Sequence, residues 1–184
     1  MDPIFKHSNG GSIYVGNQTA AADLASLTSN RITHVVNCTS GGAKIPDFHK
    51  GKLNYMEFPI TFWNQYCDSD ESVIKFADGL FSFIDSALEG GNSVLVHCLA
   101  GAHRAGTTGC VCLMHYAGLP PKSAIAMAKK CREIIGNVVE SIFGSNQLPS
   151  FAIFCHMYFR YDYFLFLAVN NYITCILAHA ISYF

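Results

Sequence analysis

The sequence predicts an α/β fold, with a central, mostly parallel sheet flanked by helices in a single domain over residues 1–150. Short β-branched and apolar segments alternate with longer segments of helical periodicity, which is the order of elements in α/β proteins. The chain has 184 residues, enough for one domain with a substantial core.

The first part of the chain is expected to supply three strands and one helix. Residues 12–16 predict a short strand that ends at a glycine, and Thr19 is the predicted cap of a helix that runs to about Leu27. Residues 32–38 are β-branched and apolar, which predicts a buried strand. The loose alternation at residues 54–58 predicts a third strand, which ends before a proline.

The next part begins with a polar-aromatic loop, expected over residues 60–70. Apolar residues then recur at helical spacing over about residues 71–89, and a glycine pair stops this helix. Residues 93–97 predict a central strand. After a loop containing a glycine, a helix is expected over about residues 104–117, and a proline pair begins another that runs over about residues 120–135.

Composition narrows the classes of partner and compartment. The formal net charge is −1, so no overall positive field would attract nucleic acid, and we expect no nucleic-acid partner. The 8 cysteines fall mostly in apolar runs, and the N-terminus lacks the apolar core of a secretory signal. We therefore expect a reducing, cytoplasmic location. The spacing of Cys and His residues matches no zinc motif, so no metal or cofactor is expected.

The last residues differ in character from the rest. Residues 151–184 are dense in aromatic and aliphatic side chains and are interpreted as a hydrophobic helical extension. The stretch 163–184 is long enough to cross a bilayer, but Asn170, Asn171 and His179 would be costly in hydrocarbon. A helix covered by protein is therefore favoured over a membrane anchor.

The segment from His97 to Arg104 has the residues needed to bind and attack a phosphate group. Cys98 follows a strand and precedes a helix, where the helix N-terminus favours the nucleophilic thiolate. Arg104 offers a planar, permanently charged fork for two phosphate oxygens. Gly101 allows the short loop to curl round an anion with its N–H groups inward. The residues expected to bind phosphate are Leu99, Ala100, Gly101, Ala102, His103 and Arg104.

This His-Cys-x5-Arg segment, with a glycine inside it, resembles the signature of the protein tyrosine phosphatase superfamily. Residues 10–145 are similar to its compact dual-specificity group in the segments at 13–16, 32–37, 83–85 and 94–98. The resemblance implies a cysteine-phosphatase fold and a cysteine-dependent phosphoric monoester hydrolase. It also implies a cysteinyl-phosphate intermediate at Cys98, and a supporting role for His97, which would help to keep Cys98 ionised. The implied partner is a phosphorylated protein carrying phosphotyrosine, with phosphoserine and phosphothreonine as further candidates.

The resemblance also implies a general acid, an Asp about thirty residues before the cysteine. Asp68 lies at that spacing, and we favour it over Asp70 as the proton donor to the leaving group. Asp70 and Glu71 occupy positions typical of a helix cap and of acidic residues in a first turn. In the implied reaction the same Asp would activate the water that releases phosphate, without a metal.

Several positions depart from the pattern of that family. Ala105 replaces the Ser or Thr whose hydroxyl helps the thiolate to leave, which puts the second chemical step in question. A pseudophosphatase that binds phosphorylated partners is therefore an alternative. The absence of lysine within the loop favours phosphoprotein over phosphoinositide, while RNA and glucan phosphates stay open as substrates. The basic group at Lys129, Lys130 and Arg132 is interpreted as a solvated helix face.

Overall fold

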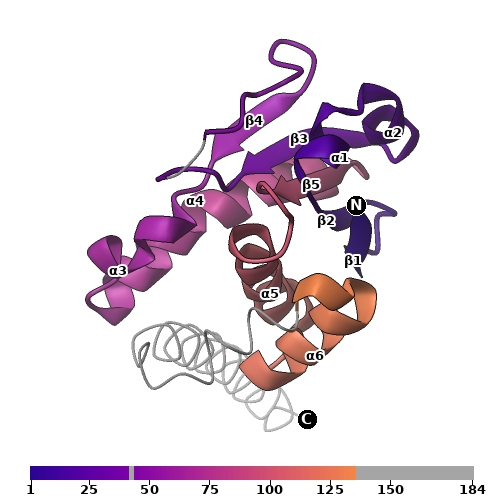
Figure 1. Ribbon diagram of the computed structural model, residues 1–184. Helices are drawn as coiled ribbons and strands as arrows, with labels where there is room; N and C mark the ends of the chain where they lie inside the picture. The colour runs from indigo at the N-terminus through magenta and orange to yellow at the C-terminus, as the bar shows by residue number, and fades with distance from the viewer. Residues whose placement is uncertain (42–43, 136–184) are drawn as a thin grey trace, which may run out of the picture.

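The computed structural model describes residues 1–41 and 44–135, which form a five-stranded sheet with helices on both faces (Figure 1). The strands are β1 (Asp2–Lys6), β2 (Ser12–Gly16), β3 (Ile32–Asn37), β4 (Asn54–Glu57) and β5 (Ser93–His97). Their order in the sheet is β1-β2-β5-β3-β4, and only β1 runs antiparallel to its neighbour. The predicted α/β class with a mostly parallel sheet is confirmed.

The helices follow the prediction most closely in the second half of the described chain. Their bounds are α1 (Gln18–Ala22), α2 (Leu24–Ser29), the 3-10 turn η1 (Ile60–Phe62), α3 (Trp63–Tyr66), α4 (Asp70–Leu88), α5 (Arg104–Ala117) and α6 (Pro121–Cys131). Gly118, with φ of 60°, ends α5 as expected. By contrast, α6 ends at Cys131, earlier than the predicted end at about residue 135.

The two faces of the sheet are covered by different helices. Val94 and Val96 of β5 point into the larger core, which also contains buried residues of α4, α5 and α6. Leu95 points to the other face and packs with Ala21 and Leu27 of α1 and α2. Every residue of β5 is buried, as expected for a central parallel strand. This strand therefore holds the loop that follows it on a rigid base.

The helix predicted from Thr19 to Leu27 is in fact two short helices. The side chain of Asn17, not that of Thr19, caps α1 by accepting a hydrogen bond from the Ala20 N–H at 3.0 Å. Asp23, with φ −86° and ψ 86°, ends α1 and caps α2 through the Ser26 N–H at 3.1 Å. The Asp side chain competes for backbone donors and so divides the segment.

Two further elements differ from the expectation. Strand β1 was not predicted, because this edge strand carries Pro3 and a register shift between Pro3 and Phe5 that obscure its alternation. The stretch 60–70, expected as a loop, contains η1 and α3, with the Trp63 side chain buried in the core. The predicted extension at 151–184 lies outside the described residues. Among the helices that are described, none combines the length and hydropathy needed to span a membrane.

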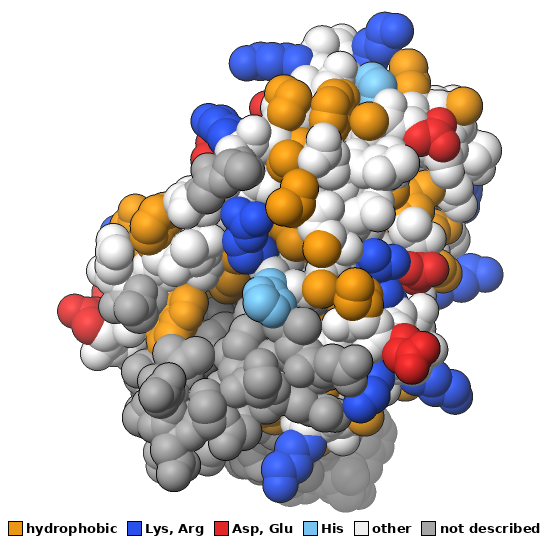
Figure 2. All heavy atoms as spheres, viewed as in Figure 1, with side chains coloured by type: hydrophobic (Ala, Val, Ile, Leu, Met, Phe, Trp, Pro, Cys, Tyr) orange, Lys and Arg blue, Asp and Glu red, His pale blue; other side chains and the backbone are white. Residues whose placement is uncertain are grey.

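The visible surface carries mixed charge. Figure 2 shows lysine and arginine side chains spread among hydrophobic and uncharged ones over this face of the molecule. This distribution agrees with a formal net charge of −1.

Candidate active site

The segment 98–103 connects the carboxyl end of β5 to the N-terminus of α5 (Figure 1), and we call it the phosphate loop. Its first residue, Cys98, is buried at 3% exposure and belongs to the larger core. Leu99, Ala100 and His103 are exposed. The predicted strand-loop-helix unit is thus confirmed, with the thiol at its base and the loop above it.

The backbone N–H groups of this loop are available to donate hydrogen bonds to a ligand. Within the part of the chain that the structure describes, none of the N–H groups of residues 99–104 donates a hydrogen bond. The loop carbonyls, in contrast, are engaged from outside: Leu99 O accepts from the Gln18 N–H at 3.1 Å. Gly101 adopts φ of 70°, which glycine tolerates best. Free N–H groups at a helix N-terminus are able to hydrogen-bond an anion.

Arg104 and Cys98 both interact electrostatically with the thiol of Cys38, the residue that follows β3. The Cys38 N–H donates to His97 O at 2.9 Å, which places it beside the start of the loop. Burial raises the pKa of the Cys38 thiol to about 12; a hydrogen bond with Thr108 and the charge of Arg104 oppose this shift, while the Cys98 charge adds to it. The structure therefore brings the predicted nucleophile and the predicted phosphate-binding arginine into one neighbourhood.

Thr108 links the N-terminal part of α5 to Cys38, the residue after β3. Its hydroxyl donates to Arg104 O at 2.9 Å and lies 3.5 Å from Cys38 Sγ. This hydroxyl is therefore engaged within the fold and does not replace the one that Ala105 lacks. Ala105 is itself fully buried.

The His97 ring is fully buried beneath the loop, and neither of its nitrogens has a hydrogen-bond partner among the described residues. Burial lowers the pKa of His97 to about 4, against smaller raising effects of the Cys98 backbone and the Asp47 carboxylate. The ring is thus neutral at physiological pH. It therefore offers no positive charge to Cys98 at that pH, and its supporting role stays a prediction.

The two candidates for the general acid lie at the corner between α3 and α4. Asp68 is exposed, and its backbone N–H donates to Ser72 Oγ at 3.0 Å. Ser69 caps α4 in a capping box with Ser72, and Asp70 is the first residue of that helix. No hydrogen bond or ion pair joins Asp68 to the phosphate loop in the described structure, so its catalytic role stays a prediction.

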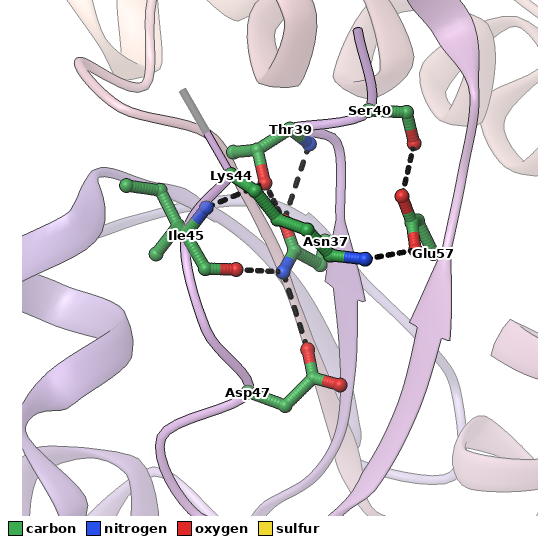
Figure 3. Close-up of polar contacts among 7 residues, drawn as sticks. All are labelled: Asn37, Thr39, Ser40, Lys44, Ile45, Asp47 and Glu57. Carbon is green, nitrogen blue, oxygen red and sulfur yellow. Dashed lines mark hydrogen bonds and ion pairs between the residues drawn. The ribbon is translucent and has the colours of Figure 1, made fainter. Parts of the chain in front are cut away.

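A polar network that the sequence analysis missed shapes the chain after β3 (Figure 3). Asn37, which pairs in register with His97, donates from Nδ2 to Ile45 O at 2.8 Å and to Asp47 Oδ1 at 3.2 Å. Its Oδ1 accepts from the Thr39 hydroxyl at 2.6 Å. An Asn at the end of a buried strand, before a turn, is the local signal that could have indicated this network.

The outer side of the same network is held by charge. Glu57, at the end of β4, accepts a hydrogen bond from the Ser40 hydroxyl at 2.8 Å and pairs with Lys44 at 3.3 Å (Figure 3). These two contacts lower the pKa of Glu57. The ion pair is exposed, so it contributes little free energy and mainly orients the segment.

One prediction about the basic group on the last helix is wrong. Arg132 is not on a solvated face, because its side chain is only 16% exposed and donates hydrogen bonds to the phosphate loop. Lys130 is exposed, as expected. No group of three or more His, Cys, Asp or Glu residues in the described ranges is arranged to hold a metal ion.

Known proteins are similar to this chain over a range that includes the phosphate loop. The family model for the dual specificity phosphatase catalytic domain matches residues 13–143. The dual specificity protein phosphatase Mpk3 of Drosophila melanogaster is 36% identical over 121 residues, which are 65% of this chain and 28% of that protein. The human dual specificity protein phosphatase 9 is 31% identical over 122 residues, with 65% and 29% covered. The chain thus spans less than a third of the length of these relatives.

Solved structures show the same arrangement of elements. The crystal structure of DUSP15 has 27% sequence identity and a TM-score of 0.53, covering 71% of this chain and 76% of that one. The human tyrosine phosphatase-like serine/threonine/tyrosine-interacting protein has 23% identity and a TM-score of 0.57, with 79% and 98% covered. The second likeness concerns the fold alone.

Proposed function

Because this chain belongs to the dual specificity phosphatase family, we propose that it is a protein phosphatase that forms a cysteinyl-phosphate at Cys98. The observation that carries the proposal is the set of open N–H groups at residues 99–104 beside Cys98. An anion with several acceptor oxygens satisfies such donors, and phosphate is the anion that the family model suggests.

The proposed reaction has two displacements at phosphorus. The Cys98 thiolate forms an S–P bond while the P–O bond to the leaving alcohol or phenol breaks, and Asp68 gives its proton to the departing oxygen. Water, deprotonated by the same carboxylate, then attacks phosphorus, and the thiolate leaves. Arg104 and the loop N–H groups stabilise the charge that develops on the equatorial oxygens.

The favoured substrate is a phosphorylated protein. Phosphotyrosine comes first, with phosphoserine and phosphothreonine as further candidates. The side chains between Cys98 and Arg104 include no lysine, so the loop carries little of the extra charge that a polyphosphorylated lipid headgroup would require.

Turnover of p-nitrophenyl phosphate tests the proposal. We expect Cys98→Ser to abolish turnover while the protein still binds inorganic phosphate, because the hydroxyl is a far weaker nucleophile than a thiolate. Cys110→Ser is the matched control, since Cys110 is a buried thiol of α5 outside the phosphate loop. Wild-type turnover by Cys98→Ser would overturn the cysteinyl-phosphate.

Ala105 favours a second candidate, a domain that binds phosphorylated proteins and releases them slowly. This position has no hydroxyl, and the Thr108 hydroxyl is engaged by Arg104 O at 2.9 Å. In a rapid-mixing experiment this candidate predicts one burst of nitrophenol per enzyme, followed by little turnover. It also predicts that Ala105→Ser raises the steady-state rate. A linear time course without a burst favours the enzyme.

A further inference from the structure

One arginine near the C-terminal end of the described chain donates hydrogen bonds to the outer side of the phosphate loop. Arg132 is the C-terminal cap of α6, and it lies 31 residues after Gly101. Its Nε donates to Gly101 O at 2.9 Å, and its Nη2 donates to Ala100 O at 3.1 Å. One planar guanidinium thus holds two successive carbonyls, a geometry that its fork of donors matches.

The direction of these carbonyls determines the direction of the N–H groups. In a trans peptide the C=O of one residue and the N–H of the next point to opposite sides, and the described chain has no cis peptide. Holding Ala100 O and Gly101 O outward therefore turns the N–H groups of Gly101 and Ala102 inward. The Gln18 N–H, which binds Leu99 O at 3.1 Å, does the same for the N–H of Ala100.

The guanidinium is itself held in place from the other side. Its Nη1 lies 2.5 Å from Asp2 Oδ2, and the Arg132 side chain is only 16% exposed. Asp2 belongs to β1, so the ion pair joins both ends of the described chain to the loop. A largely buried, charge-paired arginine keeps its orientation better than a solvated one.

We propose that Arg132, anchored by Asp2, is a positioning residue that presets the inward N–H groups of the phosphate loop. The inference rests on the proposed function. Several N–H dipoles that converge on one point repel one another. Without a bound anion, the loop therefore lowers its free energy by turning some of its peptides outward. Arg132 opposes that turn because a cation on the carbonyls favours one orientation of each peptide. The phosphate then meets a cradle that is already arranged.

The test compares Arg132→Met and Arg132→Lys with a control at the same end of α6. Lys130→Met is the matched control, because Lys130 is exposed and makes no hydrogen bond or ion pair with the loop among the described residues. The affinity for inorganic phosphate is measured by calorimetry on Cys98→Ser protein, and KM and kcat are measured for p-nitrophenyl phosphate. We expect Arg132→Met to weaken phosphate binding about tenfold and to raise KM similarly, with a smaller loss for Arg132→Lys.

Binding below the melting transition separates positioning from general stabilisation. If Arg132 served only to hold α6 in place, Arg132→Met would lower Tm but leave the phosphate Kd of the folded protein unchanged, which would overturn the proposal. Should Arg132→Met fail to fold, Asp2→Asn releases the guanidinium more mildly and is expected to weaken phosphate binding about threefold. An unchanged Kd in Asp2→Asn would then count against the proposal equally.

The wild-type protein distinguishes this inference from the function on which it rests. A wild-type chain that neither binds phosphate nor turns over the ester overturns both. Normal wild-type binding and turnover, with unchanged phosphate affinity in Arg132→Met and Asp2→Asn, overturns the positioning role alone. Equal losses in Lys130→Met and Arg132→Met would also overturn it, because the effect would then be one of net charge.

Discussion

A Cβ atom added to Gly101 would lie 2.5 Å from the carbonyl oxygen of Gly16 at the end of β2. The same atom would lie 2.9 Å from Arg132 Nη2. The phosphate loop is therefore packed against backbone on one side and against the Arg132 guanidinium on the other. Because Gly101 also has φ of 70°, a side chain at this position would be strained by its own backbone as well as by its neighbours.

We expect Gly101→Ala to lower kcat/KM for an aryl phosphate by about a hundredfold or more, since the loop must shift to relieve the contact and its N–H groups lose their convergence. Gly51→Ala is the control: Gly51 has φ of 88°, but no atom lies within 4 Å of its added Cβ. Both variants bear the left-handed strain, of about 1 kcal/mol. Similar activity in the two variants would contradict the structural explanation.

The assignment of the general acid leads to a second prediction. We expect Asp68→Asn to lower kcat about a hundredfold for a phosphate ester with a poor leaving group, such as an alkyl alcohol or unsubstituted phenol. The loss should be smaller for p-nitrophenol, which needs less protonation as it departs. Asp70→Asn should retain near wild-type kcat, because Asp70 occupies the first turn of α4. The reverse result would move the role to Asp70.

The part of the site that could be predicted is the part that is local in sequence. The apolar strand before Cys98, the glycine inside the loop and the helix from Arg104 to the left-handed Gly118 each carry their own signal within a few residues. Hydrophobic periodicity and cap chemistry decide such elements without knowledge of the rest of the fold. The position of the loop at the end of a central strand follows from these elements together.

Interactions between distant segments could not be predicted. Arg132 followed two lysines and had the pattern of a solvated helix face, but α6 ends one residue earlier and directs it to the loop carbonyls. Its partner Asp2 is 130 residues away. The break at Asp23 also depends on a side chain competing with the helix backbone, which periodicity does not register. The partners of Arg132 are set by the tertiary structure, whereas Asp23 bonds to the N–H of Ser26, which is close in sequence.

The buried His97 ring predicts how stability depends on pH. Its pKa is about 4 in the folded protein and near 6.5 in the unfolded chain, so the unfolded chain takes up the proton first. Above about pH 6.5 His97 is neutral in both states, so its pKa difference does not change the free energy of unfolding. As the pH falls from there toward 4, the free energy of unfolding decreases by at most about 3 kcal/mol. Urea unfolding between pH 7.5 and 4.5 should show a steeper decline for wild type than for His97→Leu. Parallel profiles would contradict this.

The position of Cys38 beside Cys98 predicts the outcome of oxidation. Peroxide converts the Cys98 thiolate to a sulfenic acid, with release of hydroxide, and the sulfur is thereby oxidised. The Cys38 sulfur can then form an S–S bond with Cys98 as its own proton leaves with the sulfenic oxygen as water. Cys38 is held there by its N–H, which donates to His97 O at 2.9 Å. Because burial raises the pKa of Cys38 to about 12, its thiol is not itself the first target of peroxide.

We therefore expect wild-type activity lost to peroxide to return with dithiothreitol, whereas Cys38→Ala should recover poorly because its sulfenic acid oxidises further. Mass spectrometry of tryptic peptides should detect the Cys38 and Cys98 peptides joined, with two hydrogens lost. Cys110→Ser, which changes a buried thiol of α5, should recover like wild type. Equal recovery in Cys38→Ala, without the joined peptides, would show that the neighbouring thiol does not protect Cys98.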